Sequence, residues 1–300
     1  MNCGIIGLGR MGNGIAYRAL KTGITVVGFD RNASMVSDAQ ALGVQTVATA
    51  ADLARAVEII WLMVPAGEIV DAVLQEILPH VQPGTIIIDG GNSNFKDSMR
   101  RAQQCAQQGV AFLDCGTSGG LHGREQGYCL MVGGDPAAYT KAEPLFAAVA
   151  QPGGFGLVGP SGTGHYVKMV HNGIEYGLMQ AYAEGFHILK EGSFKKESLD
   201  LEKITGIWTH GSIIRSWLLT LSHTIFVHDQ NLTTISGKIN ESGMGKWTVD
   251  EAHAHHIPAT VLETALEARA KSRVTGGNFA TKVVALLRNA FGGHAVEKKS

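Results

Sequence analysis

The sequence predicts an α/β chain in which a doubly wound parallel sheet is followed by an all-α domain. Short apolar runs alternate with helix-period segments through the first half, which is typical of a parallel sheet with helices on both faces. A Gly/Pro/Ser-rich passage at 153–164 ends this alternation, and long helical patterns follow it. We therefore expect two domains, residues 1–160 and residues 161–300.

Composition favours a protein that acts on small molecules. The chain has 300 residues, 45% of them hydrophobic, which is enough for two cores. A formal net charge of -1 argues against a nucleic-acid or membrane partner. The apolar run at 59–66 is too short to span a bilayer. A strand pattern begins almost at residue 1 and leaves no room for a secretory signal, so we expect a cytoplasmic protein.

The cysteines and clustered histidines do not predict a metal site. The four cysteines include no Cys-x-x-Cys pair, and we interpret them as reduced core residues: Cys3, Cys105, Cys115 and Cys129. His253, His255 and His256 do not share one helical face, and no cysteine or carboxylate pattern completes a zinc site. We expect a solvent-exposed helix end there and no bound metal.

A glycine motif follows the first strand. The buried strand at 3–6 runs into Gly7-Leu8-Gly9-Arg10-Met11-Gly12, and a helix pattern at 15–22 and a strand at 25–29 come next. The glycines allow a tight turn and close approach of the backbone to a pyrophosphate, which the helix N-terminus attracts. In this context the motif predicts a Rossmann-type dinucleotide-binding domain with its cofactor at residues 7–12.

Two adjacent side chains give opposite indications about the nucleotide. Asp30, at the end of the second strand, is placed to accept hydrogen bonds from the adenosine ribose and to repel a 2′-phosphate. Arg31 could instead pair with that phosphate. We favour NAD, with NADP as the alternative.

Later strands are predicted at 59–64, 85–89 and 111–114, with helices at 67–78 and 95–108. The loops after these strands face the ligand crevice of an open α/β sheet, which makes Val64, Pro65 and Asn92 cofactor candidates. Asn92 could also serve only a local turn. The turn Ser118-Gly119-Gly120 offers backbone N–H groups and a hydroxyl that suit a substrate carboxylate or hydroxyl, although a flexible turn is equally consistent.

The second half carries helical patterns at 168–191, 213–226, 258–271 and 280–290. On the first of these, Lys168, His171, Asn172 and Glu175 fall within roughly one third of the helix circumference. Lys168 and Glu175 are separated by about 10 Å of helix rise, so they can address different atoms of one extended substrate. The alternative is a solvated polar face with a buried stripe of Val167, Val170 and Ile174. We expect Trp208, Trp217 and Phe226 to be core aromatics.

These motifs resemble the 6-phosphogluconate dehydrogenase family, in its short bacterial-type form within the β-hydroxyacid dehydrogenase superfamily. The likeness runs over nearly the whole chain. It rests on residues 7–12, 118–120, 168–176 and 245–247, on Arg269, and on residues 288–294.

The resemblance implies a role for each matching residue. Lys168 matches the general base and Glu175 the acid of an oxidative decarboxylation, with Asn172 beside them. Asn92, Ser118, Gly119, Gly120, His171 and Asn172 match positions that hold the sugar acid's carboxylate and hydroxyls. Tyr176 and Arg269 match its phosphate site, and Arg288 and His294 match a tail that reaches the neighbouring subunit's site. A homodimer or homotetramer is therefore implied.

Two departures and two alternatives accompany the resemblance. Ser242 stands where longer members carry a phosphate-binding lysine, and the second copy of the helical unit found in long members is missing. A non-decarboxylating β-hydroxyacid dehydrogenase would share Lys168 and Asn172 but would not require Glu175, Arg269 or the tail. A catalytically silent NAD-binding sensor would not need that polar helix face at all.

Overall fold

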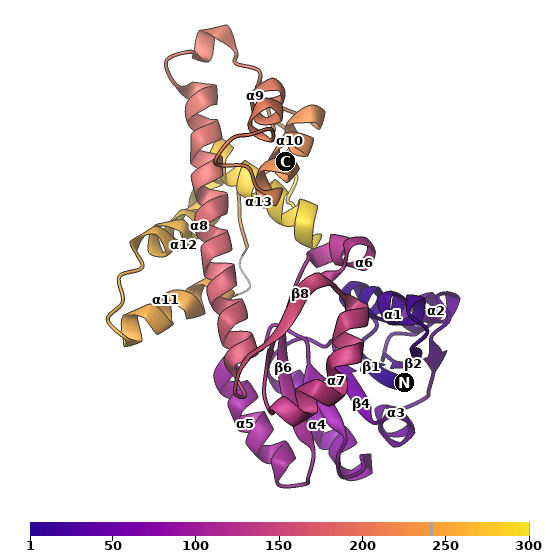
Figure 1. Ribbon diagram of the computed structural model, residues 1–300. Coiled ribbons are helices and arrows are strands. Elements are labelled where there is room, and N and C mark those ends of the chain that lie inside the picture. Colours follow the sequence, from indigo (N-terminus) through magenta and orange to yellow (C-terminus); the bar gives the residue numbers. More distant parts are fainter. Residues whose placement is uncertain (241–242, 300) are drawn as a thin grey trace. The chain divides into compact units, whose positions relative to one another are not determined.

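The computed structural model describes residues 1–240 and 243–299 (Figure 1). The chain divides into two compact units, Met1–Lys168 and Met169–Ser300. The fold class expected from the sequence is confirmed, because a mostly parallel sheet with helices on both faces forms the first unit and the second is helical.

The first unit holds an eight-stranded sheet in the order β3-β2-β1-β4-β5-β6-β7-β8. Neighbouring strands are parallel except for β6 and β7. Its strands are β1 (Asn2–Ile6), β2 (Thr25–Phe29), β3 (Gln45–Thr46), β4 (Ile59–Leu62), β5 (Ile86–Asp89), β6 (Ala111–Ser118), β7 (Tyr128–Gly133) and β8 (Ala150–Gly159). Its helices are α1 (Arg10–Lys21), α2 (Ala33–Ala41), α3 (Ala50–Ala56), α4 (Glu68–Ile77), α5 (Phe95–Ala106), α6 (Gly123–Gln126) and α7 (Pro136–Val149).

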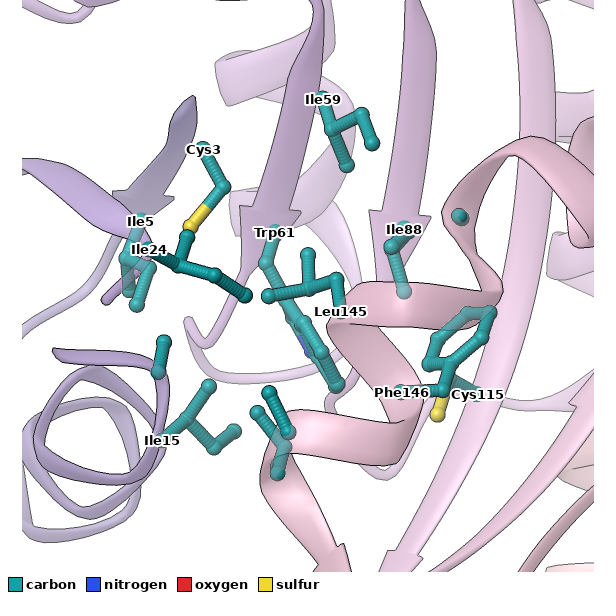
Figure 2. Packing of buried hydrophobic residues seen from close by; sticks show 14 of the residues in the cluster. Cys3, Ile5, Ile15, Ile24, Ile59, Trp61, Ile88, Cys115, Leu145 and Phe146 are labelled. Atoms are coloured by element: carbon teal, nitrogen blue, oxygen red, sulfur yellow. The ribbon is translucent and has the colours of Figure 1, made fainter. Parts of the chain in front are cut away.

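Two apolar layers hold the helices to the sheet. One layer packs α1, α2 and α7 against the sheet, and the other packs α3, α4 and α5 against its opposite face. Figure 2 shows the first layer around Trp61, whose ring meets Phe146 edge to face with centroids 5.6 Å apart. Because both faces are covered, β4 and β5 are buried along their whole length, as parallel strands usually are.

The second unit is built on α8 (Thr163–Glu191), which begins in the first unit. The other helices are α9 (Leu201–Trp208), α10 (Trp217–His228), α11 (Met244–Ala254), α12 (Thr260–Thr275) and α13 (Phe279–Gly292). A stripe on α8 at helical spacing, Tyr176, Met179, Ala183 and Phe186, is buried in the core of this unit.

Several expectations about individual residues are wrong. Cys129 is exposed, because alternation along β7 turns it away from the layer that buries Tyr128 and Leu130. Trp217 is 43% exposed at the start of α10, so it is not a core aromatic. The alternative of a buried stripe on α8 fails at Ile174, which is 53% exposed. The passage at 153–164, expected to end the alternation of strands and helices, still holds most of an edge strand, β8 (Ala150–Gly159).

Candidate active site

A cleft of about 660 Å³ opens in the first unit at the carboxyl ends of the central strands. Except for Leu8, every predicted cofactor residue lines it: Gly7, Gly9, Arg10, Met11, Gly12, Asp30, Arg31, Val64, Pro65 and Asn92. The side chain of Leu8 is buried in the core instead. Strands β1 and β4 lie side by side there while their helices cover opposite faces, which is where open α/β sheets bind ligands.

The glycine turn leaves room for a ligand against its backbone. Gly7 has φ +96°, and a Cβ there would lie 2.5 Å from the Met63 carbonyl oxygen. A Cβ at Gly12 would overlap the Gly7 carbonyl oxygen. At Gly9, in contrast, a Cβ would meet nothing within 4 Å. The first and third glycines are thus needed for the turn, and the second borders open space that a pyrophosphate would occupy.

Charged side chains line the end of the cleft that lies beside the end of β2. Asp30 Oδ2 accepts a hydrogen bond from Leu8 N at 2.7 Å, and Oδ1 accepts one from Asn32 N at 2.8 Å. Arg31 Nη2 lies 3.7 Å from Glu76 Oε2, across from it on α4. Asp30 therefore ties the glycine turn to the end of β2, and each carboxylate oxygen keeps a lone pair for a ribose hydroxyl.

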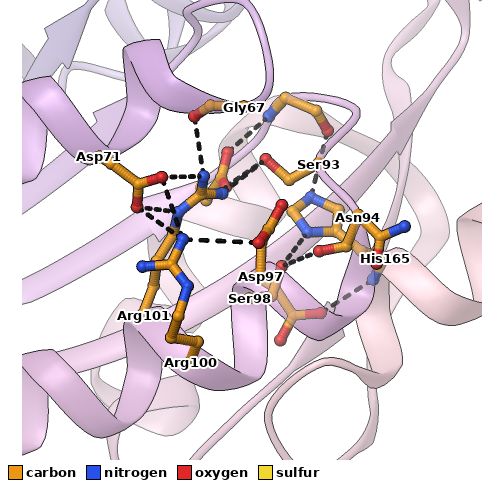
Figure 3. Close-up of polar contacts among 12 residues, drawn as sticks. Gly67, Asp71, Ser93, Asn94, Asp97, Ser98, Arg100, Arg101 and His165 are labelled. Atoms are coloured by element: carbon orange, nitrogen blue, oxygen red, sulfur yellow. Dashed lines mark hydrogen bonds and ion pairs between the residues drawn. The ribbon is translucent and has the colours of Figure 1, made fainter.

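A buried polar network lies beneath the loops after β4 and β5 (Figure 3). The guanidinium of Arg101, fully buried on α5, donates two hydrogen bonds to Asp71 and further ones to Ser93 Oγ and the Gly67 carbonyl. Its Nη1 also lies 3.6 Å from Asp89 Oδ2. The hydrogen bond from Arg101 lowers the pKa of the Asp71 carboxyl below its usual value. Arg101 thus joins the two loops that form one wall of the cleft.

The same network reaches the start of α8. His165, which has no exposed surface, bridges Ser98 Oγ (2.7 Å from Nδ1) and the Gly91 carbonyl (3.1 Å from Nε2). Because a carbonyl only accepts, Nε2 carries the proton in this pairing. Asp114, within β6, accepts hydrogen bonds from Gly162 N and His165 N and so caps the helix.

Lys168 follows His165 by one helical turn and is 5% exposed. Gly116 of β6 faces it closely: a Cβ added to Gly116 would overlap Lys168 Cβ and lie 2.8 Å from the Gly164 carbonyl oxygen. The helix therefore packs directly on the strand that leads to the Ser118-Gly119-Gly120 turn, where Gly119 and Gly120 both have positive φ. These three turn residues are partly buried and lie beside the cleft residue Thr117.

In the second unit, α8 groups three of the predicted polar side chains. His171 Nδ1 lies 3.1 Å from Asn172 Oδ1 and 4.0 Å from Glu175 Oε2. Glu175 is 22% exposed and His171 39% exposed, so their polar atoms can still reach a ligand. The predicted grouping of these residues on one helical face is present.

Tyr176 and Arg269 form a buried pair. The guanidinium carbon of Arg269 lies 3.2 Å from the centroid of the Tyr176 ring, and the two residues are 1% and 5% exposed, respectively. Gly245 permits this, since any side chain there would overlap the ring. Stacking on an aromatic face suits a planar, delocalised cation. The sequence did not predict this stacking.

The remaining predicted residues lie near the end of the chain. Arg288 on α13 is 7% exposed, and His294 beyond it is exposed, its carbonyl accepting a hydrogen bond from Asn289. Ser242 lies outside the described residues. Lys246, four residues after Ser242, pairs with Asp250 at 2.6 Å.

Two of the clustered histidines each pair with a different carboxylate. His253 pairs with Glu263 and His255 with Glu251. Over residues 1–240 and 243–299, no three His, Cys, Asp or Glu side chains gather into a group that could hold a metal ion. In the same ranges, no helix is both long and apolar enough to cross a membrane.

Comparison with known families shows the family of the chain. Residues 2–170 match the NAD binding domain of 6-phosphogluconate dehydrogenase, and residues 164–299 match the C-terminal domain of that enzyme. The chain belongs to the 6-phosphogluconate dehydrogenase family. It is therefore an oxidoreductase whose first unit carries the family's NAD-binding domain, and the resemblance inferred from the motifs is confirmed.

Relatives of similar length match from end to end. The chain is 44% identical over 302 residues to the Bacillus subtilis (strain 168) protein YqeC, covering 100% of both. It is also 44% identical over 304 residues to the NAD(+)-dependent, decarboxylating 6-phosphogluconate dehydrogenase of Haloferax volcanii, covering 100% of this chain and 99% of the relative.

Solved structures share the architecture. Plasmodium falciparum 6-phosphogluconate dehydrogenase is 28% identical with a TM-score of 0.84, covering 97% of this chain and 70% of that one. Mycobacterium tuberculosis 3-hydroxyisobutyrate dehydrogenase has a TM-score of 0.73 at 23% identity, covering 95% and 98%. The second likeness extends only to the fold.

Proposed function

We propose that the chain oxidatively decarboxylates 6-phosphogluconate to ribulose 5-phosphate and CO2 with reduction of NAD, as a cytoplasmic step of the pentose phosphate pathway. The observation that carries the proposal is helix α8, on which a buried lysine is followed two turns later by a carboxylate grouped with His171 and Asn172. This arrangement supplies a base and an acid on one helix.

NAD fits the cleft of the first unit. The open space at Gly9 and the N-terminus of α1 suit its pyrophosphate, and Asp30 suits its adenosine ribose. Val64, Pro65 and Asn92 would line its nicotinamide half. When bound, NAD accepts the hydride that leaves C3 of the sugar acid.

Lys168 would act as the general base, and then as the hydrogen-bond donor, at C3 of the substrate. As neutral amine it takes the proton of the C3 hydroxyl, and the C–O bond becomes a carbonyl as the hydride leaves. The resulting ammonium then donates a hydrogen bond to the 3-keto oxygen. Electrons from the C1–C2 bond can flow toward that polarised carbonyl as CO2 departs, so the step needs no metal. Contact with Gly116 and the Asp114 cap supports a fixed position for the amine.

Glu175 would complete the reaction by protonating the enediol left after CO2 departs, at the carbon that becomes C1 of the product. Asn172 and His171, which lie against each other beside it, would hold the hydroxyls, together with Asn92 and the Ser118-Gly119-Gly120 turn. Tyr176 and Arg269 would bind the phosphate, for which a planar guanidinium is well suited.

We further propose that residues 1–160 bind the dinucleotide and that residues 161–300 bind the substrate and form a homodimer or homotetramer, with Arg288 and His294 completing the neighbour's site. The second unit exposes large apolar side chains that such an assembly would cover. These residues are Ile174, Leu178, Ile188, Phe194, Ile207, Ile213, Ile214, Trp217, Val227, Ile257, Val261 and Val274.

A substrate panel tests the proposal. We expect kcat/KM with NAD to be highest for 6-phosphogluconate and to fall by roughly 10²-fold or more for gluconate, because a site built for phosphate leaves charged groups unsatisfied without it. Activity confined to unphosphorylated hydroxy acids such as 3-hydroxyisobutyrate would instead establish the non-decarboxylating alternative. Nucleotide binding without turnover of any hydroxy acid would favour a sensor.

A further inference from the structure

The wall of the nucleotide cleft contains an acidic residue outside the glycine motif and the end of β2. On α4, Ile69, Val73 and Glu76 line the cleft at spacings of four and three residues, so they share one helical face. Glu76 is the last of the three, and its carboxylate lies at the end of the cleft occupied by Asp30 and Arg31.

The three charges at this end are unequally engaged. Asp30 is fixed by two backbone amides, whereas the Arg31 side chain is 75% exposed and meets Glu76 at 3.7 Å. An ion pair this exposed is weak, so Glu76 biases the guanidinium without immobilising it. Two carboxylates and one guanidinium leave this region with one net negative charge.

We propose that Glu76 is a specificity-determining residue that disfavours nucleotides bearing a 2′-phosphate. The phosphate of NADP adds close to two negative charges at the adenosine ribose. Glu76 would oppose it both by direct repulsion and by competing for Arg31, the cation that would otherwise pair with it. NAD carries no charge at that position and avoids both effects. The inference concerns the nucleotide site and does not depend on which hydroxy acid the enzyme oxidises.

The test measures binding of NADH and NADPH to the full chain by nicotinamide fluorescence, without a hydroxy acid. In Glu76→Gln we expect the ratio of the NADPH and NADH dissociation constants to fall by roughly three- to tenfold, the scale of one solvent-exposed charge acting on a phosphate. Glu68→Gln, the same change on an exposed position of α4 outside the cleft lining, should leave the ratio at its wild-type value.

Two further measurements separate the electrostatic role from a packing role. The gain for NADPH should shrink as ionic strength rises, because salt screens exposed charges. The gain should also be smaller, but still present, when Glu76→Gln is added to Arg31→Met, because the change then relieves only the direct repulsion of the phosphate. An unchanged ratio in Glu76→Gln, or an equal change in Glu68→Gln, would overturn the proposal. Failure of 6-phosphogluconate turnover would affect only the proposed reaction, since these titrations contain no substrate.

Discussion

Lys168 and Glu175 occupy surroundings that suit different proton-transfer roles. Lys168 is 5% exposed, and the start of its side chain packs against Gly116 of β6. Glu175 keeps 22% of its side chain exposed and has polar neighbours on its own helix. The helical spacing in the sequence was sufficient to place both on one helix. It could not show that His165, one turn before Lys168, is a fully buried bridge, because that depends on partners from α5 and the loop after β5.

The first prediction concerns Lys168. Lys168→Met keeps the length and apolar contacts of the side chain but removes the amine, so reduction of NAD should fall by about 10²- to 10⁴-fold, the range for a lost general base. The NADH dissociation constant should stay near its wild-type value. Lys190→Met, which removes an exposed amine from the last turn of α8, is the matched control and should retain activity. Near-normal turnover in Lys168→Met would remove this lysine from the mechanism.

Glu175→Gln should reveal the second proton transfer. Oxidation and loss of CO2 precede protonation of the enediol, so rapid mixing should show a burst of reduced nucleotide equal to the enzyme concentration, followed by turnover slowed by about 10²-fold. Glu184→Gln on the same helix, where the carboxylate accepts a hydrogen bond from Gln180, should show wild-type rates. A uniform loss without a burst would mean that Glu175 acts before CO2 leaves.

At the scale of elements, the cleft depends on loops that follow parallel strands. The turn after β1 was predictable because its glycines have a recognisable spacing and a steric reason, as the positive φ of Gly7 shows. The loops after β4 and β5 were predictable in position only. Their anchoring by Arg101 was not, because a buried arginine on α5 acquires its partners from residues 67, 71, 89 and 93 through the tertiary fold.

Two glycines of the turn should affect different properties, Gly7 the stability of the fold and Gly9 the binding of the nucleotide. Gly7→Ala should lower the free energy of unfolding by about 1–3 kcal/mol, since it strains a backbone at φ +96° and crowds the Met63 carbonyl. Gly9→Ala should leave thermal stability nearly unchanged and weaken NADH binding by roughly tenfold or more, because its methyl group enters space needed by the pyrophosphate. Melting curves and NADH titrations on both variants check this. Equal NADH affinity in Gly9→Ala and wild type would remove the turn from the cofactor site.

Asp71 gives a pH-dependent prediction. Asp71→Asn should destabilise the first unit by about 1–3 kcal/mol near neutral pH, because buried Arg101 loses its bidentate partner. The loss stays moderate because the Asp71 side chain is itself partly exposed to solvent. The pKa of this carboxyl is lowered in the folded state, so its contribution is complete above the unfolded value of about 3.9 and is lost as pH falls through the lower folded value. Urea unfolding should show a constant difference between wild type and variant from about pH 5 to 8 that shrinks in acid. A difference that grows in acid would contradict the assignment.

At the scale of the whole molecule, the order of domains was clear from the sequence, and several elements were not. Strands such as β4 can be predicted from the sequence because they are unbroken apolar runs. Strand β8 does not, because it is a largely exposed edge strand interrupted by glycines and Pro152. Helices α9 and α11 are too short to show more than two or three turns of periodicity. Contacts such as Arg269 on Tyr176 depend on side chains far apart in the sequence.

Subunit complementation tests the proposed shared site. Mixing Lys168→Met chains with His294→Ala chains under conditions that allow subunit exchange should restore about a quarter of wild-type activity. Half of the dimers formed are then mixed, and in each of these one site carries both defects and the other none. Each variant exchanged with itself provides the baseline. Mixtures as inactive as their parents would show that His294 does not act in a neighbour's site.

In the proposed reaction, oxidation and decarboxylation occur together. The most direct measurement supplies 6-phosphogluconate labelled at C1 with NAD and follows reduced nucleotide by absorbance and labelled CO2 by trapping in the same reaction. We expect one CO2 for each nucleotide reduced throughout the progress curve. Reduction with the label retained in a keto acid would contradict it, and would show that this chain oxidises its substrate without decarboxylating it.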